Sequence, residues 1–190
     1  MIISASAQRV LKVIHLMTVS FWIGSGVALL SLTLTSRYAE SGSELYGVLR
    51  SMNVITLVVA VYLGAYGSFF TGLAYSVCTN RGFIRHKWVI LKWAMTIFII
   101  AFGAFYIGPD KIIMMDLVHE HGLAAQSMPE YQQAQKELLY FHVVGLSMFL
   151  ICTVLSVYKP WERQELAERY KYVRPVGSGS SPEEPTDFPG

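Results

Sequence analysis

The sequence predicts an all-α integral membrane protein, a four-helix bundle whose N- and C-termini both lie in the cytoplasm. Four apolar runs are each long enough to cross a hydrocarbon core of roughly 30 Å as a helix. Only 15% of the 190 residues are charged, which is too few to cover a water-facing surface, and 53% are hydrophobic. Lysine and arginine concentrate in the segments that four spans place on one side of the membrane.

The expected spans cover residues 10–35, 54–78, 88–107 and 139–158, and together with their connections they form a transmembrane domain over residues 1–158. The apolar stretch of the first span is much longer than the about 7 to 15 residues of a signal-peptide core. We therefore expect the first span to stay in the protein as an uncleaved helix.

The basic residues predict the orientation, because lysine and arginine are retained on the cytoplasmic side. They flank the start of the first span, fill the second loop and follow the fourth span, whereas the first and third loops hold fewer. This pattern places both termini and the second loop in the cytoplasm. We expect a multi-pass protein of the bacterial inner membrane.

Two long segments lie outside the expected spans. The loop at residues 108–138 is too long for a turn and rich in helix-forming residues, so we expect a helical extension of the fourth span or a small extracytoplasmic cap. Residues 159–190 form a cytoplasmic tail that ends in GSGSSPEEPTDFPG. Because this ending has almost nothing apolar to bury, we expect disorder from about residue 175.

Ionisable residues at membrane depth are candidates for function because they are costly to bury. His15 lies in the first span, and Trp22 is two turns further along the same helix face. Lys92 follows Trp88 by one turn in the third span, where it either extends to the headgroups or points inward to a site. Both spans start in the cytoplasm, so His15 and Lys92 lie within about 5 Å of depth and can share a site between the first and third spans.

The fourth span, which carries His142, enters the membrane from the side opposite to the first span. We therefore expect a depth difference of about 15 Å between His142 and His15. A single metal ion cannot bind both histidines across that gap, because metal–nitrogen bonds are about 2 Å long. His142 is then a second metal site, a proton-accessible group, or a histidine hydrogen-bonded between helices, the last being favoured.

The second span carries a small residue at every fourth position (Gly64, Ser68, Gly72), which favours close helix packing over approach of a flat cofactor.

Several function classes are excluded by absence of their signatures. The chain has no phosphate loop, nucleophile elbow, paired zinc-binding cysteines or haem-attaching cysteine motif. The net charge of +2 is too small and too diluted for a nucleic-acid partner. We expect the lipid bilayer as the main partner, with a homo-oligomer or a larger membrane complex both left open.

Three segments of the first 107 residues resemble a group of small bacterial membrane proteins. VLKVIHLMTVSFWIGSG (10–26) is similar to the first helix of the HemJ-type protoporphyrinogen oxidases and the copper resistance protein D family. FFTGLAYS (69–76) is similar to the end of their second helix, and RHKWVILKWAMT (85–96) to the third helix of the HemJ type. The chain has SLTLTSRY where the HemJ type has a tyrosine-leucine-proline-arginine run, and its third loop is longer.

The resemblance implies a bound haem b and a redox function. In the HemJ type the first-helix histidine and the third-helix lysine are both needed for activity. The resemblance thus makes His15 a ligand of the haem iron or a proton carrier, and it makes Lys92 a catalytic residue paired with a propionate or an anionic substrate. Trp22, Trp88 and Gly72 then line the cofactor site. We expect a haem-associated or redox-linked membrane protein, with a HemJ-like oxidoreductase as its most specific form. The alternatives are a transporter or channel for a metal ion or small anion, and an accessory subunit of a larger complex.

Overall fold

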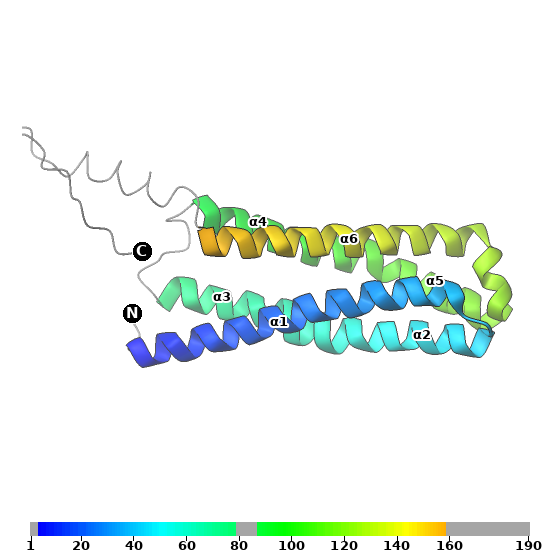
Figure 1. The fold of residues 1–190 in the computed structure, drawn as a ribbon, viewed down its shortest axis with the longest axis horizontal. Coiled ribbons are helices and arrows are strands. Elements are labelled where there is room, and N and C mark those ends of the chain that lie inside the picture. Colours follow the sequence, from blue (N-terminus) through cyan, green and yellow to red (C-terminus); the bar gives the residue numbers. More distant parts are fainter. Residues whose placement is uncertain (1–3, 79–86, 159–190) are drawn as a thin grey trace, which may run out of the picture.

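The computed structural model describes residues 4–78 and 87–158, and the expected tail at 159–190 lies outside them. All elements within these two ranges are helical, which confirms the all-α prediction. Four helices are long and apolar enough to cross a membrane: Ala5–Tyr38, Gly42–Cys78, Val89–Ser127 and Pro129–Tyr158. They run side by side as long rods, and the start of the first helix and the end of the fourth, called here the termini of the bundle, lie at the same end (Figure 1).

Each long helix is built from one to four consecutive elements. The first joins α1 (Ala5–Thr35) to the short 3₁₀ turn η1 (Ser36–Tyr38), and the fourth is the single helix α6 (Pro129–Tyr158). The second consists of α2 (Gly42–Val54), the π-helical η2 (Ile55–Tyr66) and α3 (Gly67–Cys78). The third consists of α4 (Lys87–Phe102), the π-helical η3 (Gly103–Ile107), α5 (Gly108–His121) and the 3₁₀ η4 (Gly122–Ser127).

The helix boundaries follow local capping chemistry. The Ser4 hydroxyl accepts a hydrogen bond from the Ala7 N–H at the start of α1. At the start of α2 the Ser41 hydroxyl accepts from the Glu44 N–H at 3.2 Å, and the Glu44 carboxylate accepts from the Glu40 N–H at 2.9 Å. The α5 helix ends at His121 and is followed by Gly122, whose φ of 59° a residue with a side chain rarely adopts.

Small residues of the second helix let α1 approach it closely. A Cβ added at Gly64 would lie 2.7 Å from the Trp22 Cβ, and one added at Gly67 would lie 2.7 Å from the Thr18 Cγ2. Atoms of α1 therefore occupy the space that side chains would need at these positions. The small residues of the second span thus allow close helix packing, which is the interpretation that the sequence favoured over approach of a flat cofactor.

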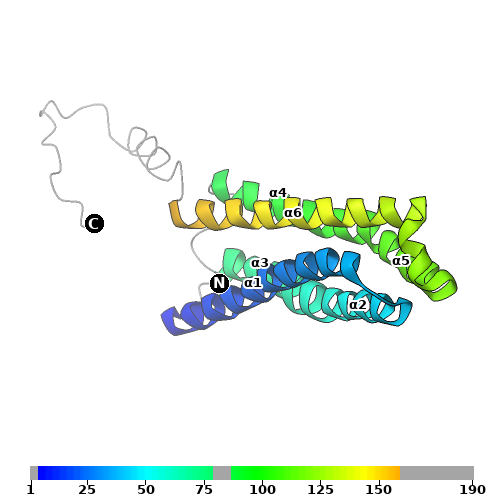
Figure 2. The same ribbon diagram turned by 45° about the vertical axis from the view of Figure 1, so that its right-hand side comes forward.

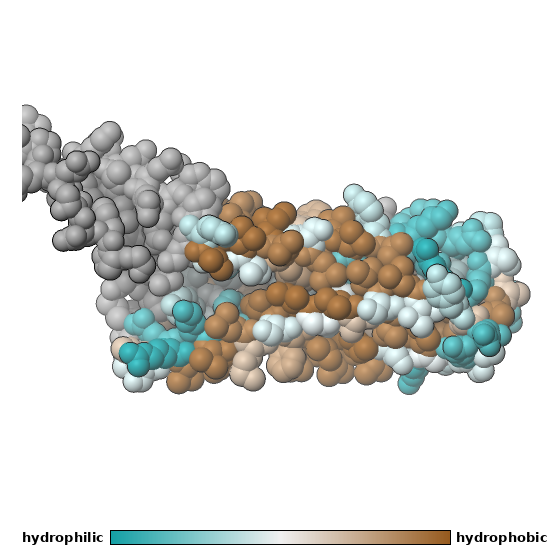
Figure 3. Space-filling model, in the orientation of Figure 1, coloured by the Kyte–Doolittle hydropathy of each residue, from teal (hydrophilic) through white to brown (hydrophobic). Residues whose placement is uncertain are grey.

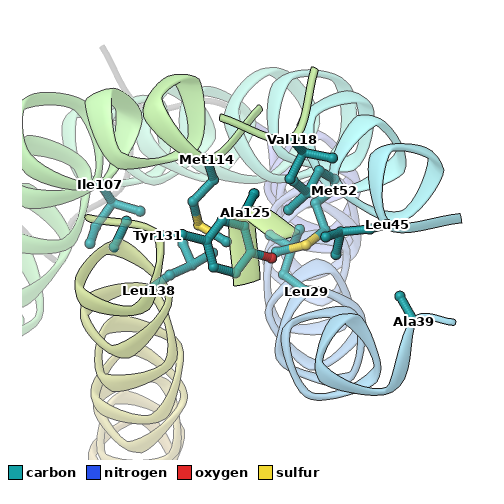
Figure 4. Packing of buried hydrophobic residues seen from close by; sticks show 12 residues of the cluster. Leu29, Ala39, Leu45, Met52, Ile107, Met114, Val118, Ala125, Tyr131 and Leu138 are labelled. Atoms are coloured by element: carbon teal, nitrogen blue, oxygen red, sulfur yellow. The ribbon is translucent and has the colours of Figure 1, made fainter. Parts of the chain in front are cut away.

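The main hydrophobic core lies at the end of the bundle remote from the termini. There α2 packs against α5, and α5 packs against η4 and α6 (Figure 2). The buried side chains surround Tyr131 and Met114 (Figure 4) and are called the cap core: Leu29, Ala39, Leu45, Leu49, Met52, Ile107, Met114, Val118, Ala125, Tyr131, Ala134 and Leu138. Residues 108–138 thus comprise α5, η4 and the first turns of α6, which form a packed helical cap.

The half of the bundle nearer the termini is packed more loosely. Among the residues whose side chains the structure describes, none is buried before Trp22 in α1, after Ser68 in α3, between residue 89 and Ile99 in α4 or after Gly145 in α6. The face seen in Figure 3 is apolar along the middle of the rods, with hydrophilic residues at the cap and at the N-terminal end of α1. His15 and Lys92 both belong to this looser half.

Candidate functional site

The His15 side chain is held by a hydroxyl group on a neighbouring helix. Its Nδ1 lies 2.9 Å from the Oγ1 of Thr71 on α3. The Thr71 hydroxyl has a single proton, which it donates to the Gly67 carbonyl oxygen at 2.6 Å. With the Thr71 proton directed to Gly67, we assign the proton of the neutral imidazole to Nδ1, which then donates to the Thr71 oxygen. Nε2 is then left with its lone pair, the state in which a histidine binds a metal.

Glycine makes room for the imidazole ring of His15. A Cβ at Gly72 would lie 3.3 Å from the His15 Cε1, so a larger side chain would displace the ring. On α1 itself, the Thr18 hydroxyl donates to the His15 carbonyl oxygen at 2.8 Å and its methyl group fills the space left by Gly67. The structure thus brings His15 and Gly72 into direct contact.

Lys92 points from α4 toward α6. Its Nζ donates to the Ser156 Oγ at 2.7 Å, and the Ser156 hydroxyl donates in turn to the Cys152 carbonyl oxygen at 2.7 Å. Lys92 is half-buried. Lys92 and His15 lie in the same half of the bundle, each bonded to a hydroxyl of a different helix.

The two predicted tryptophans are not placed beside His15 by the described contacts. Trp22 is buried where α1 abuts Gly64, and its ring meets Phe149 of α6 edge-on with a centroid distance of 4.8 Å. From His15 to Trp22 the helix rises by about 10 Å at 1.5 Å per residue. Trp88 belongs to α4, but its side chain lies outside the part of the chain that the structure describes.

His142 lies far from His15 along the bundle. Its Nδ1 is 3.2 Å from the Thr33 Oγ1, near the end of α1, and only 5% of the residue is exposed. From residue 15 to residue 33, α1 rises by about 27 Å. This separation exceeds the expected depth difference of about 15 Å, because His142 meets the last turn of α1 rather than its middle. A metal ion bound to His15 cannot also bind His142.

The site offers one histidine as a ligand for a cofactor. Among the described residues, no group of three or more His, Cys, Asp or Glu side chains is placed to hold a metal ion. A haem needs only one or two axial ligands. His15 fits that need because Thr71 orients its ring and leaves Nε2 available, in the loosely packed half of the bundle.

Sequence reasoning missed the hydroxyl partners and one lysine. Thr71 and Ser156 carry no distinctive signal, since a hydroxyl that bonds the carbonyl four residues earlier is common in apolar helices. Lys111 was counted with the third loop, yet it is only 8% exposed and donates from Nζ to the Thr56 Oγ1 at 2.6 Å. The apolar run Ile112–Met115 after Lys111 was the available signal that the third helix continues.

Comparison with known protein families, curated proteins and solved structures finds no match to this chain.

Proposed function

We propose that this protein is a haem-associated, redox-linked integral membrane protein whose cofactor site lies in the half of the bundle nearer the termini. The observation that carries the proposal is the hydrogen bond between His15 and Thr71, which leaves Nε2 as a ligand. When bound, the haem supplies one-electron chemistry. The resemblance of residues 10–26 and 85–96 to the HemJ type supports the same assignment and favours an oxidoreductase.

The lateral surface supports insertion into a membrane. Large apolar side chains are exposed on every long helix, including Val27, Phe70, Phe105 and Leu150, of which Phe105 is 83% exposed. So extensive an apolar surface is unfavourable in water and suits lipid tails. The excess of lysine and arginine near both termini and in the second loop supports an orientation with these segments in the cytoplasm. The site then lies in the cytoplasmic leaflet, and the cap lies on the opposite side.

Each residue of the site has a distinct role in this proposal. The His15 Nε2 binds the iron, and Thr71 holds the ring in orientation. The Lys92 ammonium, held by Ser156, attracts a carboxylate because the surroundings have a low dielectric constant. That carboxylate belongs either to a haem propionate or to an anionic substrate. Gly72 keeps the space that the His15 ring occupies.

An absorption spectrum tests the assignment of His15. We expect full-length protein purified in detergent from haem-supplemented cells to show a Soret band that His15→Ala abolishes. Thr71→Val should weaken haem binding roughly 10- to 100-fold through loss of ring orientation, and Thr71→Ser should restore it. His142→Ala is the matched control and should keep the band, since His142 lies about 27 Å away along the bundle. Colourless wild-type protein would overturn the proposal.

The role of Lys92 is tested by comparing two substitutions. Lys92→Arg keeps the positive charge, whereas Lys92→Met keeps only the apolar stem, so we expect Met to weaken haem binding or activity more than Arg. Haem retention during dilution and the turnover of an anionic substrate are the two measurements. Equal behaviour of the two variants would show that the charge of Lys92 serves neither purpose.

Transport is the second candidate function, because the same histidine and lysine lie in the loosely packed half where a solute could enter. A flux assay in proteoliposomes separates the two functions: flux of a metal ion or small anion that depends on His15, in protein without a Soret band, would favour transport. An accessory subunit would instead co-purify with stoichiometric partners in mild detergent.

A further inference from the structure

The half of the bundle that holds His15 and Lys92 consists of two layers of helices. One layer is formed by α1 and α3, where His15 bonds to Thr71, and the other by α4 and α6, where Lys92 bonds to Ser156 (Figure 1, Figure 2). The two residues therefore belong to different layers. A haem that binds both of them lies between the layers and must enter across one of the edges where the layers meet.

The two edges are packed differently. At the α1–α6 edge the helices approach closely: a Cβ added at Gly26 would lie 3.1 Å from the Leu146 side chain, and the Trp22 and Phe149 rings meet with a centroid distance of 4.8 Å. At the α3–α4 edge, the described part of α4 packs mainly against α6 and not against α3. The α3–α4 edge is thus the less tightly packed of the two.

An aromatic contact joins α3 to α4 at the depth of the site. The Phe69 and Trp93 rings meet edge to face, with a centroid distance of 5.1 Å and an interplanar angle of 88°. Phe69 is two residues from Thr71, and Trp93 is next to Lys92, so the contact lies within about 3 Å of these residues along each helix. Two residues turn a helix by about 200°, which places Phe69 on the side of α3 away from His15. Both rings belong to half-buried residues.

A row of aromatic side chains leads from the exposed face of the second long helix to this contact. Tyr62, Tyr66 and Phe70 are four residues apart and are 63%, 46% and 62% exposed. The centroids of neighbouring rings lie 6.1 and 6.4 Å apart, and the Phe70 ring lies 5.5 Å from that of Phe69. Aromatic rings attract other flat aromatic groups through stacked and edge-to-face contacts. The row therefore offers a flat macrocycle in the bilayer a series of contacts that ends at the α3–α4 edge.

Resting on the proposed function, we propose that Phe69 and Trp93 form a gate at the α3–α4 edge, through which haem enters the site laterally from the bilayer. The apolar macrocycle favours the hydrocarbon, and the charged propionates favour the headgroup region. Parting of the two rings opens the edge at the depth of His15 and Lys92. The Lys92 ammonium, beside Trp93 in the sequence, then attracts a propionate. The rings meet in both the empty and the loaded protein, so the gate slows entry and exit alike.

A gate differs from a binding residue in its kinetics. Phe69→Ala removes a contact that must break on the way in and on the way out, so association and dissociation of haem should both become roughly two- to tenfold faster with little change in Kd. Phe69→Tyr keeps the ring and should keep the wild-type rates. Phe98→Ala is the matched control, because Phe98 is 51% exposed and stacks on Phe102 of the same helix, so both rates should stay unchanged.

Stopped-flow absorption at the Soret band measures association in full-length protein reconstituted into phosphatidylcholine vesicles. Transfer of haem to excess apomyoglobin measures dissociation, and circular dichroism shows that each variant is folded. At a fixed ratio of haem to lipid, lateral entry predicts that the association rate stays constant when the vesicle suspension is diluted with buffer. Both reactants then remain in the same membrane, whereas entry from water would slow in proportion to the dilution.

Three outcomes would overturn the gate. Faster dissociation alone in Phe69→Ala would show that Phe69 stabilises the bound haem, unchanged rates in this variant would show that the contact with Trp93 does not limit entry, and slower wild-type association on dilution would show entry from water. Each of these outcomes leaves the haem site in place. Absence of a Soret band in the wild-type protein would instead overturn the proposed function.

Discussion

Replacing Gly64 by alanine should force α1 away from the second helix. The added Cβ would lie 2.7 Å from the Cβ and 2.8 Å from the Cα of Trp22, where carbon atoms in contact are normally about 3.5 to 4.0 Å apart. Because the Cα belongs to the backbone, no change of the Trp22 rotamer relieves the clash. The two helices must therefore separate locally by about 1 Å.

The expected magnitude follows from two opposing terms. Overpacking of a tight interface costs about 1 to 3 kcal/mol, whereas alanine is about 1 kcal/mol more favourable than glycine inside a helix. Gly64→Ala should thus lower the free energy of unfolding by about 0 to 2 kcal/mol. Gly47 of α2 is the matched control, since it is exposed and a Cβ there would have no atom within 4 Å. Gly47→Ala should raise the free energy of unfolding by about 1 kcal/mol.

The difference between the two variants isolates the packing term, about 1 to 3 kcal/mol, because both gain the same helix preference. Reversible unfolding in mixed detergent micelles, followed by tryptophan fluorescence, measures it. If Gly64→Ala is as stable as Gly47→Ala, the close approach of these helices is refuted.

The same unfolding assay checks two further predictions. Leu45→Ala should cost about 2 to 5 kcal/mol because Leu45 is fully buried in the cap core, whereas Leu57→Ala, at a side chain 47% exposed, should cost far less. Equal losses would show that the cap is not a packed core. Thr33→Val removes the hydroxyl that contacts the buried His142 Nδ1 and should cost about 1 to 3 kcal/mol. No loss on this substitution would mean that Thr33 does not satisfy His142.

The helices were predictable because their signal is local. A run of about 20 apolar residues must be helical at membrane depth, whatever surrounds it, since the backbone has no other way to satisfy its hydrogen bonds there. The ends were less predictable. The second long helix starts at Gly42 instead of residue 54, and the third continues to Ser127 instead of residue 107. These extensions are stabilised by burial of Leu45, Leu49 and Met114 in the cap core, which depends on segments far apart in the sequence.

By itself, the sequence determined the helical class, the four apolar rods and three candidate residues, His15, Lys92 and His142, because apolarity and isolated ionisable groups can be read along one chain. Only the tertiary structure decided their partners. His15 bonds to α3, Lys92 bonds to α6, and Lys111 moves from an expected loop into the interior, where it bonds to Thr56. A hydrogen bond requires two groups within about 3 Å at a suitable angle. The rotation of each helix and the identity of its neighbours set that geometry. The spacing of residues along a single helix determines neither of them.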